Sequence, residues 1–433
     1  MNEVTVGILG LMVILALFLT GIELGFAMGV IGFLGFSYIV SFKAGLNMVA
    51  KDIFDVFSSY GFTVIPLFVL MGQMAYNAGI AKRLYNTSYR FIGHIPGGLA
   101  MATVGGAAAF GAITGSSPAT AATFASVAVP EMNRYGYHPK LSTGIVASVG
   151  TLGSLIPPSV TLIIFGIITE QSIGKLFLAA IIPGLMVTLF LLGVIYGWCK
   201  INPSLGPKGE ISTWKERLIS LKDVIWVVVI FLLVIGGMTW GFFTPTEAGS
   251  MGCFAVLVLS VIKRDINFKG FILSVSESLR TACMVLMLIA GSTILGHFLV
   301  VTKIPMIAAD WIGGLPLPNY MIMLIILLVY ELGGSFIDDL AFMVLATPIF
   351  YSAIINLGYD PIWFGVILHI FVMIGVLIPP MAINVFVVKN ITKVPFGVIY
   401  SGVYPFLISF IVCAALLFMF PGLTTFLPNM FMK

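Results

Sequence analysis

The sequence GSLIPPS at residues 153–159 places two adjacent prolines inside a hydrophobic run, and GVLIPPM repeats this pattern at 375–381. The first glycines of the two motifs, Gly153 and Gly375, are 222 positions apart (375 − 153). Proline has no N–H to bond the carbonyl oxygen four residues earlier, and it disfavours helical geometry in the residue before it. The fold must therefore accommodate two interrupted helices in equivalent places.

The composition places these helices in a lipid bilayer. Of the 433 residues, 60% are hydrophobic and only 9% are charged, whereas soluble domains carry about 25% charged residues. Apolar stretches of about 17–25 residues, long enough to cross a bilayer, recur along the chain and predict an all-α polytopic membrane protein. The sequence has no Walker A motif and no pattern typical of nucleic-acid binding, so we expect neither ATP hydrolysis at such a site nor a nucleic-acid partner.

Further matches indicate that the chain consists of two related halves. GYHP at 136–139 and GYDP at 358–361 have the same displacement of 222 residues. GSS at 115–117 and GGS at 333–335 are displaced by 218, which implies an insertion of four residues (222 − 218) in the second half. The predicted parts of the chain are a first repeat at 1–200, a cytoplasmic linker at 201–222 and a second repeat at 223–433.

The distribution of Lys and Arg predicts the orientation. Basic residues gather in four short loops, around 82–90, 134–140, 200–222 and 263–269. We expect these loops on the cytoplasmic side, which makes equivalent spans of the two halves run in opposite directions, as in the inverted-topology repeats of secondary transporters. This topology requires re-entrant hairpins at 101–131 and 319–352. It leaves ten full spans, an interfacial helix at about 43–58, and both termini on the non-cytoplasmic side.

The two broken helices, at about 141–168 and 362–390, are predicted to expose backbone groups inside the membrane. Irregular backbone at this depth is tolerated only where it is buried in protein or lines a cavity. The carbonyl oxygens that the prolines are predicted to release are those of Gly153, Ser154, Gly375 and Val376. Such oxygens suit Na⁺, while the half-helices predicted to begin at Ser159 and Met381 point positive dipoles that favour a carboxylate. A single proline kink would be ordinary, but two in register favour a functional site.

The hairpin tips supply side-chain oxygen. GSSPAT at 115–120 carries hydroxyl groups, and the tip of the second hairpin carries Ser335 and two carboxylates, Asp338 and Asp339. A carboxylate within a membrane is costly and marks a candidate functional site. Adjacent residues on a helix face different ways, so we expect one of the two, Asp339, to support a cation site. The alternative is that one of them caps the helix of the returning arm.

Three segments carry a resemblance to a known family. Residues 115–184, which begin GSSPATAATFASVAVPEMNRYGYHP, together with FTPTEAG at 243–249 and GVLIPPMAINVFVV at 375–388, resemble the large membrane subunit of tripartite ATP-independent periplasmic (TRAP) transporters. The resemblance runs over nearly the whole chain. It implies Na⁺-driven import of organic acid anions, such as C4-dicarboxylates or sialic acid, across the bacterial inner membrane.

The same resemblance implies two partner proteins. One is a periplasmic substrate-binding protein that delivers the organic acid. The other is a small membrane subunit with four spans, sometimes fused to the large subunit in one chain. Because no such fused segment precedes Met1, we expect the small subunit to be a separate chain.

The TRAP family also resembles divalent anion/Na⁺ symporters of elevator type, in which hairpins and broken helices form a transport domain that slides against a scaffold. This likeness implies a Na⁺ site between each hairpin tip and the neighbouring break, hence at least two coupling ions, with the substrate between them. The residues expected at the Na⁺ sites are Gly115, Ser116, Ser117, Gly153, Ser154, Pro157, Ser159, Gly333, Gly334, Ser335, Asp339, Gly375, Val376 and Pro379. The residues expected at the substrate are Ser117, Thr120, Ser159, Asp338 and Asn384.

Three other functions are alternatives to a TRAP large subunit. A stand-alone Na⁺/anion symporter would need neither partner, and uptake by this chain alone would identify it. An intramembrane enzyme is not expected, because Ser116 has no recognisable partner histidine and no G-x-G-D motif accompanies the two aspartates. A passive channel is the third alternative.

Overall fold

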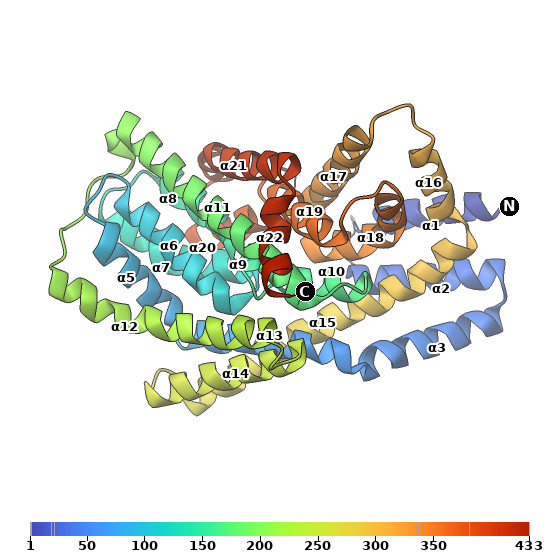
Figure 1. Ribbon diagram of the computed structural model, residues 1–433, viewed down its shortest axis with the longest axis horizontal. Helices are drawn as coiled ribbons and strands as arrows, with labels where there is room; N and C mark the ends of the chain where they lie inside the picture. Colours follow the sequence, from blue (N-terminus) through green and yellow to red (C-terminus); the bar gives the residue numbers. More distant parts are fainter. Residues whose placement is uncertain (1, 19, 21, 337, 381, 433) are drawn as a thin grey trace.

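The computed structural model describes residues 2–18, 20, 22–336, 338–380 and 382–432. Within these residues every regular element is a helix (Figure 1), which confirms the predicted all-α class. The α-helices of the first half are α1 (Glu3–Phe18), α2 (Leu24–Ile39), α3 (Phe42–Ser58), α4 (Val64–Asn77), α5 (Ile80–Ile92), α6 (Gly98–Thr114), α7 (Ser117–Arg134), α8 (Pro139–Gly150), α9 (Leu152–Leu155), α10 (Val160–Ile168) and α11 (Ile173–Ile201). Those of the second half are α12 (Trp214–Phe231), α13 (Gly237–Thr239), α14 (Pro245–Ile262), α15 (Phe268–Val301), α16 (Ile304–Gly313), α17 (Asn319–Phe336), α18 (Asp339–Asn356), α19 (Pro361–Gly375), α20 (Ile383–Thr392), α21 (Phe396–Met419) and α22 (Gly422–Phe431). Two 3-10 turns, at Tyr60–Thr63 and Pro203–Leu205, and a π-helical segment at Leu232–Gly236 complete the described elements.

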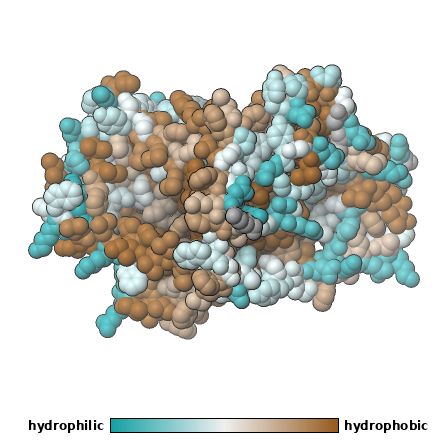
Figure 2. Space-filling model, viewed as in Figure 1, coloured by the Kyte–Doolittle hydropathy of each residue, from teal (hydrophilic) through white to brown (hydrophobic). Residues whose placement is uncertain are grey.

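The surface of the molecule is rich in exposed apolar side chains, as a lipid-facing protein requires (Figure 2). By length and composition, seven described helices are able to cross a membrane, or nine if each of two bent helix pairs counts as one span. The predicted count of ten full spans is not reached by this measure, because α1 and α2 have only 16 residues each and because two of the seven, α17 and α18, are the arms of the second hairpin. A helix, α3, does form at the predicted interfacial segment 43–58.

The first predicted re-entrant segment, 101–131, folds as the hairpin of α6 and α7. The chain reverses at Gly115, whose φ of 65° lies in the left-handed region that glycine enters without steric cost. The second arm begins after Ser116, whose Oγ accepts a hydrogen bond from the Ala119 N–H at 3.4 Å and so caps the helix. Thus the GSSPAT sequence supplies both the turn and the cap.

The second predicted re-entrant segment, 319–352, folds as the hairpin of α17 and α18. Its second arm begins after Asp338, whose Oδ1 accepts hydrogen bonds from the N–H groups of Leu340 and Ala341 at 3.2 and 3.4 Å. Asp338 is therefore the helix cap that the sequence left as an alternative role for one of the two aspartates. The two hairpins lie on opposite sides of the centre of the molecule (Figure 1).

Both predicted broken helices are interrupted at their double prolines. In the first, 141–168, helix α10 is bent by 43° from α8 and α9. In the second, 362–390, α19 ends at Gly375 and α20 begins at Ile383. Both Pro–Pro peptide bonds are cis. Met381, the predicted start of the second half-helix, lies outside the described residues.

A layer of long helices borders the hairpins. Helix α15 packs along both α2 and α4, and α14 also packs on α4 (Figure 1). Glycine allows the closest of these contacts: a Cβ atom at Gly25 would lie 2.8 Å from the Met287 carbonyl oxygen, and one at Gly32 would lie 2.8 Å from the Leu295 nitrogen. These close backbone contacts hold α15 against α2.

The predicted linker, 201–222, is only partly non-helical. Helix α12 begins inside it at Trp214, because Thr213 and Glu216 form a capping box. The Glu216 carboxylate accepts from the Thr213 N–H at 2.8 Å, and the Thr213 hydroxyl accepts from the Glu216 N–H at 3.4 Å. The inverted relation of the two halves on either side of this linker stays a prediction.

Candidate transport site between the hairpin tips

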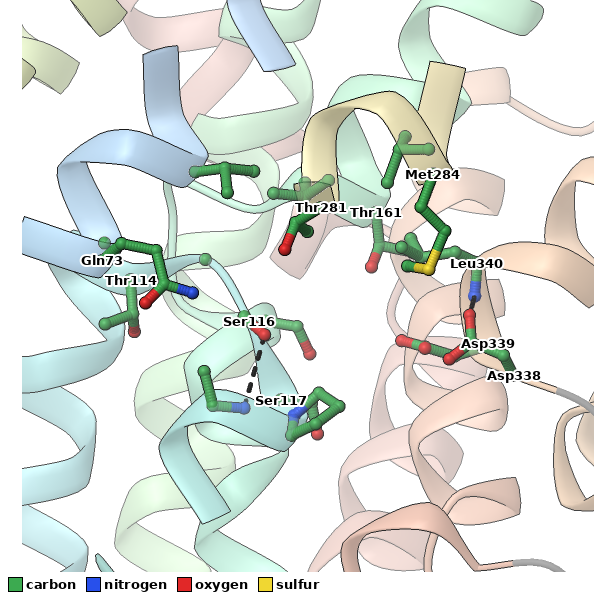
Figure 3. A pocket seen from close by; sticks show the side chains of 18 of the residues that line it. Gln73, Thr114, Ser116, Ser117, Thr161, Thr281, Met284, Asp338, Asp339 and Leu340 are labelled. Carbon is green, nitrogen blue, oxygen red and sulfur yellow. Dashed lines mark hydrogen bonds between the residues drawn. The ribbon is translucent and has the colours of Figure 1, made fainter. Parts of the chain in front are cut away.

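A cavity of about 260 Å³ lies between the tips of the two hairpins. Both tips, the first helix break, α4 and α15 contribute to its wall (Figure 3). Six of the predicted site residues line it. They are Gly115, Ser116, Ser117, Ser154, Asp338 and Asp339.

The first hairpin tip is packed directly against the first break. The Val160 N–H donates to the Gly115 carbonyl at 3.4 Å. A Cβ atom at Gly153 would overlap Thr120 Oγ1 and would lie 2.6 Å from the Ser116 carbonyl oxygen. Thr120 in turn donates to that same carbonyl at 2.9 Å. The structure therefore brings together the tip and the break that were expected to share the first Na⁺ site.

The second tip meets the second break in the same manner. A Cβ atom at Gly375 would lie 2.5 Å from the Glu331 carbonyl oxygen and 3.0 Å from the Ser335 nitrogen. The Gly375 carbonyl is not left without a partner, because its oxygen accepts a turn hydrogen bond from the Ile378 N–H at 3.3 Å. This hydrogen bond, from the N–H three residues later, takes the place of the helical hydrogen bond that Pro379, four residues later, cannot donate. The role of the Gly375 carbonyl at a Na⁺ site stays a prediction, since a carbonyl oxygen has a second lone pair. The carbonyls of Gly153, Ser154 and Val376 accept no comparable backbone bond from the described residues.

Side chains from the two halves of the chain meet behind the cavity. Asn384 Nδ2 donates to Ser117 Oγ at 2.9 Å, and the Ser154 hydroxyl contacts the Met373 sulfur at 3.1 Å. Asn384, Ser117 and Ser154 are all buried. The first tip and both broken helices therefore form one connected unit.

Three helix N-termini converge on the cavity. Its wall includes the first residues of α7, α10 and α18, represented by Ser117, Thr161 and Leu340. The charged groups among the described lining residues are the carboxylates of Asp338 and Asp339. Asp339 is only 4% exposed. Positive helix dipoles and negative side chains thus face the same space, which is an arrangement suited to an anion and a cation bound side by side.

Several predicted residues lie around the cavity and do not form its wall. Ser159 is buried and caps α10, accepting from the Leu162 N–H at 3.3 Å, and Ser335 donates to the Leu332 carbonyl at 2.7 Å. The other predicted residues outside the wall are Thr120, Gly153, Pro157, Gly333, Gly334, Gly375, Val376, Pro379 and Asn384. Among the described residues, the second broken helix reaches the cavity indirectly, through the contacts of Asn384 with Ser117 and of Met373 with Ser154.

The far wall of the cavity was missed by sequence reasoning. It is formed by α4 and α15, which contribute Gln73, Tyr76, Thr281 and Met284. Figure 3 shows Gln73 beside Thr114 and Ser116, Met284 next to Leu340 and the two aspartates, and Thr281 between Gln73 and Met284. Gln73 did carry a local signal, since it is a polar amide within the apolar run VIPLFVLMGQMAYN.

The family model of the DctM component of tripartite ATP-independent periplasmic transporters matches residues 11–423. The chain belongs to this family. It is a TRAP large permease and a multi-pass protein of the bacterial inner membrane, and the alternative of an intramembrane enzyme is set aside because its relatives are permeases.

Individual relatives agree with this membership. The chain is 33% identical to a C4-dicarboxylate TRAP large permease of Pseudomonas aeruginosa, over 89% of this chain and 90% of the relative. It is 31% identical to a sialic acid TRAP large permease of Vibrio cholerae, over 96% and 97% of the two chains. An isethionate TRAP permease of Oleidesulfovibrio alaskensis, named DctMQ, is 33% identical over 80% of this chain and 55% of its own length.

Two solved transporter structures share the fold of this large permease. The YdaH transporter of Alcanivorax borkumensis superposes with a TM-score of 0.63 at 13% identity, over 88% of this chain and 89% of that one. MtrF of Neisseria gonorrhoeae, described as one of a class of antimetabolite efflux pumps, gives a TM-score of 0.55 at 15% identity, over 87% and 84%. At these identities the likeness concerns the fold alone.

Proposed function

We propose that this large permease imports an organic acid anion together with Na⁺, with the anion bound in the cavity between the two hairpin tips. The single observation that carries the proposal is the convergence of three helix N-termini and two aspartates on that cavity. The family membership supplies the transport role, and relatives named for C4-dicarboxylate and sialic acid point to an organic acid as the cargo.

Electrostatics explains why such a cavity requires cations. A carboxylate entering the cavity is attracted by the N-termini of α7 and α10 but repelled by ionised Asp338, which caps α18, and by ionised Asp339. Bound Na⁺ removes this repulsion, since it neutralises the aspartate charge and presents positive charge to the substrate. Anion and cation binding are then coupled, which is the thermodynamic requirement of a symporter.

The Na⁺ ions are placed at the tip-to-break contacts. At the first contact, Gly153 packs against the Thr120 hydroxyl and the Ser116 carbonyl, and the carbonyls of Gly153 and Ser154 are the candidate backbone ligands. At the second, Asp339 and the carbonyls of Gly375 and Val376 are the candidate ligands, since the Gly375 carbonyl accepts one hydrogen bond and keeps a second lone pair. Oxygen ligands from unwound helices and carbonyl groups are the usual Na⁺ donors in secondary transporters.

We further propose an elevator movement and two partner proteins. The connected unit of hairpins and broken helices slides against the layer that contains α2, α4, α14 and α15. A periplasmic binding protein delivers the anion, and a small four-span membrane subunit completes the transporter. The rival is a stand-alone symporter that transports without a binding protein.

Uptake into proteoliposomes tests these proposals together. Vesicles that hold the chain and its small subunit are given labelled succinate or labelled N-acetylneuraminate, with and without an inward Na⁺ gradient and the binding protein. We expect uptake of one acid only when both the gradient and the binding protein are present. Uptake without Na⁺ would overturn the coupling, and Na⁺-driven uptake without the binding protein would identify the stand-alone symporter.

A further inference from the structure

We infer that Gln73 and Thr281, on the far wall of the cavity, contact the transported anion and help to determine which acid is accepted. The inference rests on the proposed function, because it assigns a role at the same site. It concerns α4 and α15, which lie outside the hairpins and broken helices.

The position of the far wall is fixed by close packing. A Cβ atom at Gly72, the residue before Gln73, would lie 2.7 Å from the Thr114 carbonyl oxygen at the first tip. Asn77, one turn after Gln73, donates to Ser274 Oγ of α15 at 2.8 Å. In this conformation helix α4 packs against the first tip on one side and against α15 on the other, and these contacts place Gln73 at the cavity.

The polar groups of the wall are available to a ligand. The Gln73 amide forms no side-chain hydrogen bond with another described residue, and Figure 3 shows it directed along the cavity toward Thr114 and Ser116. Thr281 donates to the Glu277 carbonyl at 3.0 Å, but rotation of its hydroxyl turns that donor toward the cavity. An amide and a hydroxyl are donors suited to a carboxylate or hydroxyl group of the substrate.

The hairpin tips and the far wall of the cavity therefore bind different groups of the anion. The N-termini of α7 and α10 and the Na⁺ ions hold one carboxylate of the anion on the tip side. Gln73 and Thr281 bind a polar group of the anion from the side of α4 and α15. Neutral variants of the far wall should therefore raise the half-saturating concentration of the acid and leave unchanged the half-saturating concentration of Na⁺ measured at saturating acid.

The test measures both constants in proteoliposomes with the small subunit and the binding protein, using whichever labelled acid the unmodified transporter takes up. Gln73→Glu has nearly the same size but adds a negative charge, so we expect it to raise the half-saturating acid concentration about tenfold or more, and more than Gln73→Asn does. Thr281→Val should raise it severalfold. For the neutral variants Gln73→Asn and Thr281→Val, the half-saturating Na⁺ concentration at saturating acid should stay within twofold.

Thr293→Val is the matched control for Thr281→Val. Both threonines lie on α15 and donate to the carbonyl four residues earlier at 3.0 Å, but Thr293 does not line the cavity. If Gln73→Glu does not assemble with the small subunit, as judged by size-exclusion chromatography, the comparison of Thr281→Val with Thr293→Val tests the inference. The inference is overturned if the half-saturating acid concentration is unchanged in the assembled variants. It is also overturned if the half-saturating Na⁺ concentration of the neutral variants rises in parallel. Absence of Na⁺-driven uptake by the unmodified transporter overturns the proposed function itself.

Discussion

Asn384 in α20 and Ser117 in α7 are 267 positions apart (384 − 117) and share a buried hydrogen bond of 2.9 Å between Nδ2 and Oγ. The same Asn384 amide donates to the Ala147 carbonyl of α8 at 3.2 Å. A single side chain of the second broken helix thereby fixes both the first hairpin and the first broken helix. Asn384 therefore joins predicted site residues of the two halves of the chain.

Replacing Asn384 by Ala should lower the free energy of unfolding by about 1–3 kcal/mol, because it leaves the Ala147 carbonyl and the Ser117 hydroxyl buried without this partner. Thermal or denaturant unfolding of the purified protein measures the change. Ser117→Ala in the Asn384→Ala background should add less than it does alone, since the shared bond is already lost. Asn356→Ala, at an exposed position of α18, is the control and should change little. Equal losses at positions 384 and 356 would contradict the assignment.

Asp339→Asn should raise the Na⁺ concentration needed for half-maximal uptake about tenfold or more, since it removes one charge from a buried cavity-lining side chain while keeping its shape. Uptake measured against Na⁺ concentration shows the shift. Asp360→Asn serves as a control, because Asp360 caps α19 through the Trp363 N–H at 2.9 Å and asparagine keeps that cap. The cation assignment fails if both variants show the Na⁺ dependence of the unmodified protein.

The hairpins and breaks were predictable because their signals are local. Gly115 and Ser116 specify a reversal and a helix cap within two residues, and a double proline interrupts a helix wherever it occurs. In an apolar chain, such residues stand out against their neighbours. The approximate bounds of both hairpins and both broken helices follow from them.

The far wall and the finer backbone chemistry were not predictable in this way. Gln73 and Thr281 are 208 positions apart (281 − 73), and nothing in either segment indicates that α4 and α15 pack together. The Gly375 carbonyl shows a second limit of sequence-based prediction. The missing N–H of Pro379 predicts the loss of a helical hydrogen bond, but it does not predict the turn hydrogen bond that Ile378 donates in its place. Asp338 shows a third, since its sequence allowed both a cap and a ligand.

His369 and His297 should respond in opposite directions to the same substitution. His369 is buried in α19, and its ring nitrogens have no side-chain partner among the described residues, with the Ser154 backbone nearby. His369→Leu should therefore raise the free energy of unfolding by about 1 kcal/mol, because it removes a buried polar group whose hydrogen bonding is poor. His297 Nε2 lies 3.3 Å from the buried Asp52 carboxylate, so His297→Leu should lower stability by leaving that group unpaired. Unfolding temperatures of the two variants decide the point, and a shift of the same sign in both contradicts it.

Gly153→Ala should impair both folding and transport, since its new methyl group has no space. The Cβ atom would overlap Thr120 Oγ1 and lie 2.6 Å from the Ser116 carbonyl oxygen, and overpacking of this kind costs about 1–3 kcal/mol. Gly193→Ala is the matched control, because a Cβ atom at Gly193, in α11, meets no atom within 4 Å, and alanine favours a helix interior over glycine by about 0.5–1 kcal/mol. We therefore expect a lower unfolding temperature and reduced Na⁺-driven uptake for Gly153→Ala, and an unchanged or higher unfolding temperature with normal uptake for Gly193→Ala. Similar behaviour of the two variants would show that the first tip does not depend on close contact with the first break, and would remove the basis for a Na⁺ site between them.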